Sequence, residues 1–264
     1  MRLGNNIDCG FTLAEVLITL GIIGVVAAIT LPAVINETRN KELEVQFKKV
    51  YSELNQIAML FKNEKGISMS EWVNENHVFG SSQGNASKFV PLIMQYYNGN
   101  RKFDDVVFSS TDDEGNARSI KYDIFTMNGT KLRIGPCDDS GFYYDVGGRI
   151  FSFVGDGVAS GDDGPVVCVD INGIKKPNKY GYDLHIFYFT TDGYVLPMGQ
   201  PHKNNPTSTT VQDGTSNNFF VTGPNYCKSS SSVTNQAACA YYALQDKNPQ
   251  GEGNYWQDFL GSNR

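Results

Sequence analysis

Glu15 is the side chain whose position most needs a chemical explanation. It stands directly before Val16–Ile35, a stretch without any charged residue. Twenty residues of helix cover about 30 Å, which is the thickness of the hydrocarbon core of a bilayer. An unpaired carboxylate at the edge of such a segment is unfavourable by on the order of a few kcal/mol. We therefore expect Glu15 to reach the interface or to meet a group of opposite charge.

The residues around this carboxylate resemble the N-terminal signature of type IV pilins and of the pseudopilins of type II secretion systems. The matching positions are Gly10, Phe11, Thr12, Leu13, Glu15 and Pro32. The resemblance implies that a prepilin peptidase cuts between Gly10 and Phe11 and that Phe11 becomes N-methylated. It also implies that Glu15 acts in filament assembly and that Pro32 kinks the helix.

Cleavage at this junction would supply the missing partner of Glu15. The new α-amine of Phe11 on one subunit can neutralise Glu15 on its neighbour when such helices bundle in a filament core. Two other interpretations of the N-terminus remain. A secretory signal peptide would be cut near Ala28, but its apolar core is shorter than this one. A plain signal anchor explains the length and leaves Glu15 and the Gly-Phe junction without a role.

Beyond Ile35 the helical pattern continues in amphipathic form. Apolar residues recur at spacings of three and four, with charged residues between them: Leu43, Phe47, Val50, Tyr51, Leu54, Ile57, Leu60 and Phe61. This spacing predicts one helix from about Thr12 to Phe61, softened at Pro32 and stopped by Gly66. We expect its second half to place the apolar stripe on a globular domain.

The rest of the chain predicts one turn-rich domain with an antiparallel sheet, so that the fold class is α+β and pilin-like. Expected strands are 106–109, 119–125, 131–134, 166–171, 184–189 and 194–197, with a hairpin turn at Asn128-Gly129 and helices at 86–97 and 235–244. The organisation that follows is a leader at 1–10, a transmembrane and assembly helix at 11–35, its amphipathic continuation at 36–63 and an extracytoplasmic domain at 64–264.

Four cysteines remain once Cys9 leaves with the leader. An even number in an extracytoplasmic domain favours two disulfides, for which three connectivities exist. We favour the pairs Cys137–Cys168 and Cys227–Cys239, because each closes a short loop and the second resembles the C-terminal disulfide of pilins. Free buried thiols are the alternative.

Oxygen ligands gather in one loop, at Asp170, Asn172 and Asp183. Hard cations prefer such oxygens, and calcium accepts irregular geometry. Some pseudopilins hold calcium in a C-terminal loop, so the resemblance adds support for calcium as a cofactor, although none is required. The alternative is a turn in which these side chains cap their own backbone.

Nothing in the sequence indicates catalysis. The three histidines are scattered, and no nucleophile, zinc or nucleotide-binding motif is present. The net charge of −6 argues against a general nucleic-acid surface. The resemblance therefore implies a structural subunit of the inner membrane and later of a filament, whose partners are prepilin peptidase, other subunits and an assembly platform. The alternative is a minor, tip-located binding module for DNA uptake, adhesion or cargo.

Overall fold

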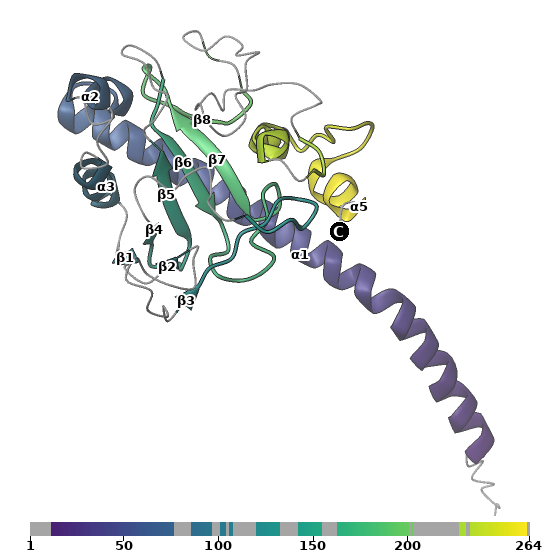
Figure 1. Cartoon of the computed structure of the whole chain (residues 1–264). Coiled ribbons are helices and arrows are strands. Elements are labelled where there is room, and N and C mark those ends of the chain that lie inside the picture. Colours follow the sequence, from purple (N-terminus) through teal and green to yellow (C-terminus); the bar gives the residue numbers. More distant parts are fainter. Residues whose placement is uncertain are drawn as a thin grey trace, which may run out of the picture.

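Helix α1 (Leu13–Lys65) is the longest element and continues through Pro32. The structure, a computed structural model, describes residues 12–76, 86–96, 101–103, 106–107, 120–132, 142–154, 163–200, 202, 227–230 and 233–262. Figure 1 shows the first part of α1 projecting alone and the second part lying along the domain. The helix ends at the expected residue, because Gly66 takes the left-handed conformation at φ 77° and donates its N–H to the Lys62 carbonyl.

The second half of α1 buries the predicted apolar stripe. Its buried residues are Asn40, Leu43, Phe47, Val50, Leu54, Ile57, Ala58 and Phe61. Leu60, which we expected in the stripe, is exposed, because it lies about 100° around the helix from Phe61. Asn55 fixes the helix to the sheet, since its Oδ1 accepts from the Val195 N–H at 2.9 Å and its Nδ2 donates to the Val195 carbonyl at 3.2 Å.

Six of the described strands form an antiparallel sheet in the order β1-β4-β5-β6-β7-β8. Their bounds are β1 Arg101–Phe103, β4 Phe142–Tyr144, β5 Ile150–Val154, β6 Val166–Asp170, β7 Leu184–Phe189 and β8 Val195–Pro197. Both β6 and β7 are buried at every residue, as expected for central strands covered on both faces. The predicted α+β architecture, a long N-terminal helix on an antiparallel sheet, is confirmed.

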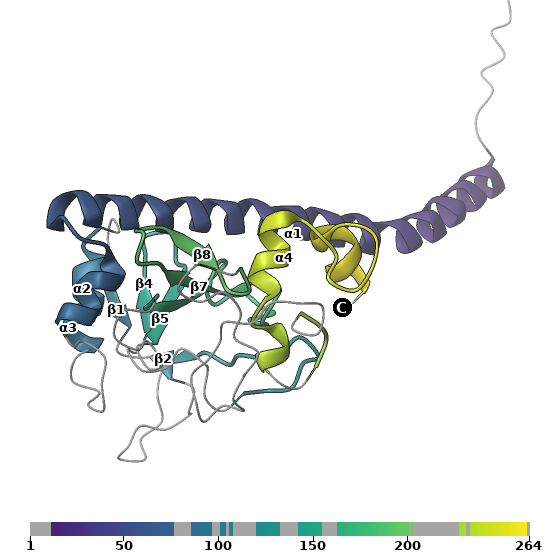
Figure 2. The same ribbon diagram turned by 90° about the horizontal axis from the view of Figure 1, so that it is seen from above.

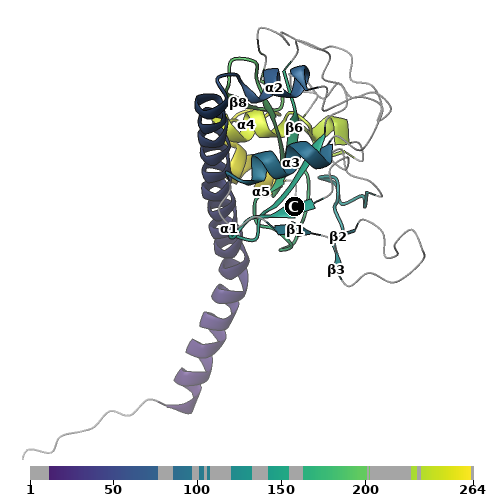
Figure 3. The ribbon, with the colours of Figure 1, turned by 90° about the vertical axis from the view of Figure 1, so that its left-hand side faces the viewer.

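Helices cover the sheet at both ends of the domain. Figures 1 and 2 show α2 (Met69–Glu75) and α3 (Ala86–Met94) at the end away from the free part of α1, and Figure 3 views the domain from that end. The C-terminal elements are η2 Val233–Gln236, α4 Cys239–Gln245, η3 Tyr255–Phe259 and α5 Leu260–Ser262. In Figure 2, α4 and α5 lie against α1 close to the point where it leaves the domain.

Several local expectations were wrong. The pair β2 (Val106–Val107) and β3 (Ile120–Lys121) is parallel, in a region where we expected antiparallel pairing. The expected turn at Asn128-Gly129 is present and closes an antiparallel bridge between Phe125 and Lys131, but this bridge is isolated and the described residues beside it form no strand. Sequence reasoning also missed α2, β4, β5 and η3, which are short or carry no clear period, and it began the 235–244 helix four residues early.

Candidate functional site

The first half of α1 is exposed to solvent along its whole length. Every described residue from Thr12 to Arg39 is exposed, over about 40 Å of helix. The exposed side chains include Leu17, Ile18, Ile22, Ile23, Val26 and Ile29. By length and composition this helix can cross a membrane. An apolar surface of this size requires lipid or other protein chains around it.

Glu15 closes the N-terminus of this exposed helix. Its Oε2 accepts from the Thr12 backbone N–H at 2.8 Å and from the Thr12 hydroxyl at 2.7 Å. In return, the Thr12 Oγ1 accepts from the Glu15 N–H at 3.2 Å. This is a capping box, and the sequence analysis missed it although the spacing Thr-x-x-Glu signals one. Gly10 and Phe11 lie outside the described residues, so the cleavage site stays a prediction.

The exposed half contains small residues and one proline. Gly21 and Gly24 have no atom within 4 Å of where a Cβ would lie, so that another helix can come close to the backbone there. Pro32 removes one backbone hydrogen bond inside α1. Figure 2 shows α1 straight along the domain and curved beyond it, in the part that includes Pro32.

Along α1, the first contacts with the domain are made with the loop between β6 and β7. Asn40 is the first buried residue of α1, and Arg39 directly before it donates through Nη2 to the backbone oxygen of Lys176. Gly173 holds the loop against the β4–β5 turn, because its φ is +72° and a Cβ there would collide with the Gly148 carbonyl oxygen. The loop therefore has a fixed position beside the exposed helix.

Asp183 organises this loop from inside. Its carboxylate accepts from the backbone N–H of Asn178 at 2.9 Å, from that of Lys179 at 2.6 Å and from Nδ2 of Asn172 at 3.2 Å. Burial raises the pKa of Asp183 to about 6, against the lowering effect of these hydrogen bonds. Two of these three bonds satisfy backbone N–H groups of the turn, and the third ties the Asn172 side chain to it.

Asp170 lies next to Asp183 in the same buried network. The Tyr122 hydroxyl donates to its Oδ2 at 2.5 Å, and the Asn172 N–H donates to its Oδ1 at 3.2 Å. Burial, followed by the charge of Asp183, raises the pKa of Asp170. Burial also raises the pKa of Tyr122 well above its ordinary value. The two carboxyls thus share a site in which a second negative charge is unfavourable.

The donor set fits calcium only in part. Asp170, Asn172 and Asp183 are brought together, and all three offer hard oxygen ligands. However, Asn172 turns its Nδ2 toward Asp183 and leaves its buried Oδ1 without a hydrogen bond, so the amide must rotate to ligate together with Asp183. Among the described residues no group of three or more His, Cys, Asp or Glu side chains is placed to hold a metal ion. Calcium binding here stays a prediction.

The cysteines support the sequence analysis as far as they are described. The structure contains the Cys227–Cys239 disulfide, which ties the segment before η2 to the start of α4. Cys168 is also disulfide-bonded. Its predicted partner Cys137 lies outside the described residues, so the pairing Cys137–Cys168 stays a prediction.

Two histidines make polar contacts that the sequence did not predict. His202 bridges two carboxylates, with Nδ1 2.6 Å from Asp163 and Nε2 3.0 Å from Asp192. His185 is buried in the core against Phe47, with Nε2 3.0 Å from the Tyr182 carbonyl oxygen. Burial lowers the pKa of His185 to about 4, so that it is neutral and donates to that oxygen. Both histidines bond to fixed groups, which indicates structural roles.

Comparison with known proteins gives one match. Residues 5–31 match the family model described as the prokaryotic N-terminal methylation motif. No curated protein and no solved structure matches the chain. The motif is the signature of type IV pilins and pseudopilins, and the long apolar helix with an antiparallel sheet is consistent with a pilin-like fold. This signature favours a structural subunit over an enzyme.

Proposed function

We propose that this chain is a structural subunit of a filament of the type IV pilus or type II secretion kind. It is made as a precursor anchored in the inner membrane by Val16–Ile35, with the domain on the extracytoplasmic side. Prepilin peptidase cuts between Gly10 and Phe11, and the mature chain then leaves the membrane and joins a filament. The methylation motif and the fully exposed first half of α1 support this function.

The exposed half of α1 is the main support for this proposal, because it needs an apolar environment both in the precursor and in the filament. In the precursor, lipid covers the segment, and in the filament the same helices of neighbouring subunits cover it. Transfer from lipid to protein changes little in the hydrophobic effect, since both are apolar. The direction and register of assembly must therefore come from polar groups and close packing.

Glu15 is the polar group that can set this register. In the free chain its carboxylate is already bonded to Thr12, within one residue of the proposed new amine at Phe11. In a filament the amine of a neighbouring subunit meets Glu15 only at one axial offset. Pairing there removes the cost of a carboxylate in an apolar environment, so this offset is favoured over others.

The test compares three variants of one helix. Glu15→Gln retains an acceptor for the capping box but removes the charge. Glu15→Ala removes both, and Glu37→Ala removes an exposed carboxylate beyond the apolar segment. We expect all three to insert into membranes, and we expect only the two Glu15 variants to lose filament yield in sheared preparations. Normal yield from Glu15→Gln would contradict a role for the charge.

A further inference from the structure

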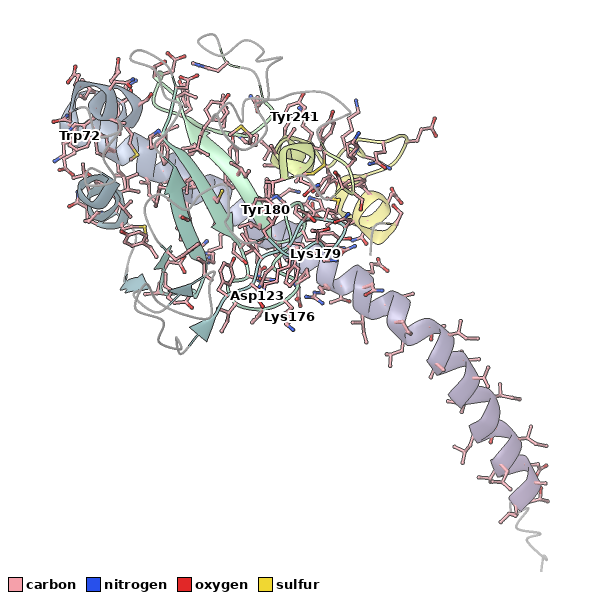
Figure 4. All side chains as sticks on the ribbon, viewed as in Figure 1. Trp72, Asp123, Lys176, Lys179, Tyr180 and Tyr241 are labelled. Atoms are coloured by element: carbon pink, nitrogen blue, oxygen red, sulfur yellow. A yellow bond between two sulfur atoms is a disulfide. The ribbon has the colours of Figure 1, made fainter. Side chains whose placement is uncertain are left out.

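The loop between β6 and β7 presents an exposed apolar and basic tip. Three consecutive residues are exposed there, namely Ile174, Lys175 and Lys176. The Ile174 side chain retains 57% of its accessible surface. Figure 4 shows Lys176 near the point where the free part of α1 leaves the domain, and the backbone oxygen of Lys176 accepts from Arg39 of α1. The buried carboxylate of Asp183 holds the base of this loop, so that the tip has a fixed direction.

A groove separates this tip from α1. It has a volume of about 450 Å³ and is lined on the helix side by Val34, Ile35, Thr38, Arg39, Glu42, Leu43 and Gln46, and on the loop side by Asn172, Lys175 and Lys176. Three of these side chains are basic and one is acidic. The groove is therefore positive in a chain whose net charge is −6.

The groove lies at the depth of lipid headgroups when α1 spans a bilayer. Ile35 ends the uncharged segment, and Arg39, four residues later, is about 6 Å further along the helix. The headgroup layer on each side of a bilayer is about 5 to 8 Å thick. Arg39 contacts the backbone of Lys176, so the loop tip is fixed at the same level.

We propose that residues 171–179 form a docking loop for the anionic phospholipid surface of the membrane that holds α1. Lys175, Lys176 and Arg39 bind headgroup phosphates, and Ile174 enters the interface between them. Lysine and arginine beside an apolar residue are typical of peptides that lie on anionic membranes. The inference rests on the proposed membrane-anchored precursor, and it adds a second membrane contact that orients the domain.

The loop can contact phospholipid only while the chain is anchored in the membrane. When the subunit leaves the bilayer, the lysines lose the phosphates and return to water. A neighbouring acidic domain is the other surface that could cover the loop. It would require crowded chains, whereas a lipid contact forms around a single anchored chain, and this difference separates the two occupants.

The test measures lysine reactivity in the full chain inserted in nanodiscs. One set of discs contains phosphatidylcholine alone, and the other also contains phosphatidylglycerol. A water-soluble acetylating reagent is added, and mass spectrometry gives the modification rate at each lysine. We expect Lys175 and Lys176 to react several-fold more slowly in the anionic discs. Lys48 and Lys65 lie about 20 and 45 Å beyond Ile35, further than the screening length, and should react equally in both.

A pair of matched variants tests the apolar part of the tip. Ile174→Glu adds a negative charge at the exposed tip and should abolish the protection of Lys175 and Lys176 by anionic lipid. Met59→Glu adds the same charge at another exposed apolar residue, far along α1, and should leave the protection unchanged. High salt should weaken the protection in the original chain, because the phosphate contacts are partly screened.

The outcomes separate the docking loop from the proposed function. Equal rates at Lys175 and Lys176 in both kinds of disc, with the chain anchored, would overturn the docking loop and leave the membrane anchor standing. Protection that appears only with several chains in one disc would assign the loop to a neighbouring subunit and also overturn the inference. A chain that fails to remain with either disc would contradict the anchored precursor itself.

Discussion

The two halves of α1 have the same secondary structure and opposite environments. Residues 13–39 are exposed on every side, whereas residues 40–61 bury one continuous stripe against the sheet and the C-terminal elements. The exposed half is the more apolar of the two and has no charge between Val16 and Ile35. In a protein that functions alone in water, the more apolar half would be the buried one.

This difference shows which part of the fold the chain completes by itself. The second half of α1 finds its partners within the chain, in β8, α4 and η3 and, through the rings of Phe47 and Tyr51, in β7. The first half must find them in lipid or in other chains. Substitutions in the two halves should therefore affect different quantities, namely folding in one case and anchoring or assembly in the other.

Phe47→Ala should give the largest loss of folding stability. The ring is fully buried and lies 4.7 Å from that of His185 and 5.5 Å from those of Phe187 and Trp256. Truncation leaves a cavity, so we expect a loss of about 3–5 kcal/mol in the free energy of unfolding. Denaturant unfolding of the full chain in detergent micelles, followed by the fluorescence of buried Trp256, measures it.

Ile23→Ala is the matched change in the exposed half. Ile23 retains 62% of its accessible surface, so its truncation should alter the unfolding of the domain by less than about 0.5 kcal/mol. Equal losses for the two variants would remove the distinction between the halves, because Ile23 would then have to be part of the folded core.

The pH dependence of stability should report His185, which packs directly on Phe47. Its pKa is about 4 in the folded chain and about 6.5 when unfolded, since burial disfavours the charged form. The stability is complete above pH 6.5 and is lost as the pH falls through 6.5 toward 4, by up to about 3 kcal/mol. The raised pKa of Asp183 acts in the opposite direction between about pH 6 and 4, because protonation of this carboxyl favours the folded state.

His185→Gln separates the two effects. The difference in unfolding free energy between the original chain and this variant should be constant above pH 6.5 and should shrink as the pH falls below it. The Asp183 contribution cancels in this difference. A constant difference from pH 7 to 4 would show that His185 is not buried in its neutral form.

Asp183→Asn should give a smaller effect, at the junction between the two halves. The amide keeps one oxygen acceptor but turns an NH2 group toward one or two of the three N–H groups that now bond to the carboxylate, which should cost about 1–3 kcal/mol in unfolding free energy. Relief of repulsion with Asp170 offsets part of this loss. The calcium prediction adds a second measurement, in which millimolar calcium raises the unfolding midpoint of the original chain and not of the variant. An unchanged midpoint in the original chain would contradict calcium binding.

Sequence patterns predicted the long helix well because its signals extend over many residues. The uncharged run, the stripe through Leu43 and Phe61 and the stop at Gly66 each follow from a local rule of composition or spacing. The central strands β6 and β7 were predicted for the same reason, as apolar runs between turns. Short elements such as α2, β4 and β5 were missed, because tertiary contacts rather than their own patterns determine them.

The sequence predicted only those parts of the candidate site that charge or residue type marks. Glu15 stood out by charge alone, and the loop carboxylates Asp170 and Asp183 by residue type. The contact of Arg39 with Lys176 spans 137 positions, and no local pattern signals it. The positive groove at the base of the domain, on which the docking loop depends, therefore became visible only in three dimensions.

The most direct test of the exposed half of α1 is the mass and N-terminal sequence of the chain from membranes, with and without co-expressed prepilin peptidase. We predict that the peptidase converts the chain to one that begins at N-methylated Phe11. This result would place Glu15 four residues from the end of a helix ready for assembly. A chain that keeps Met1 in the presence of the peptidase, or one cut near Ala28, would contradict the filament function.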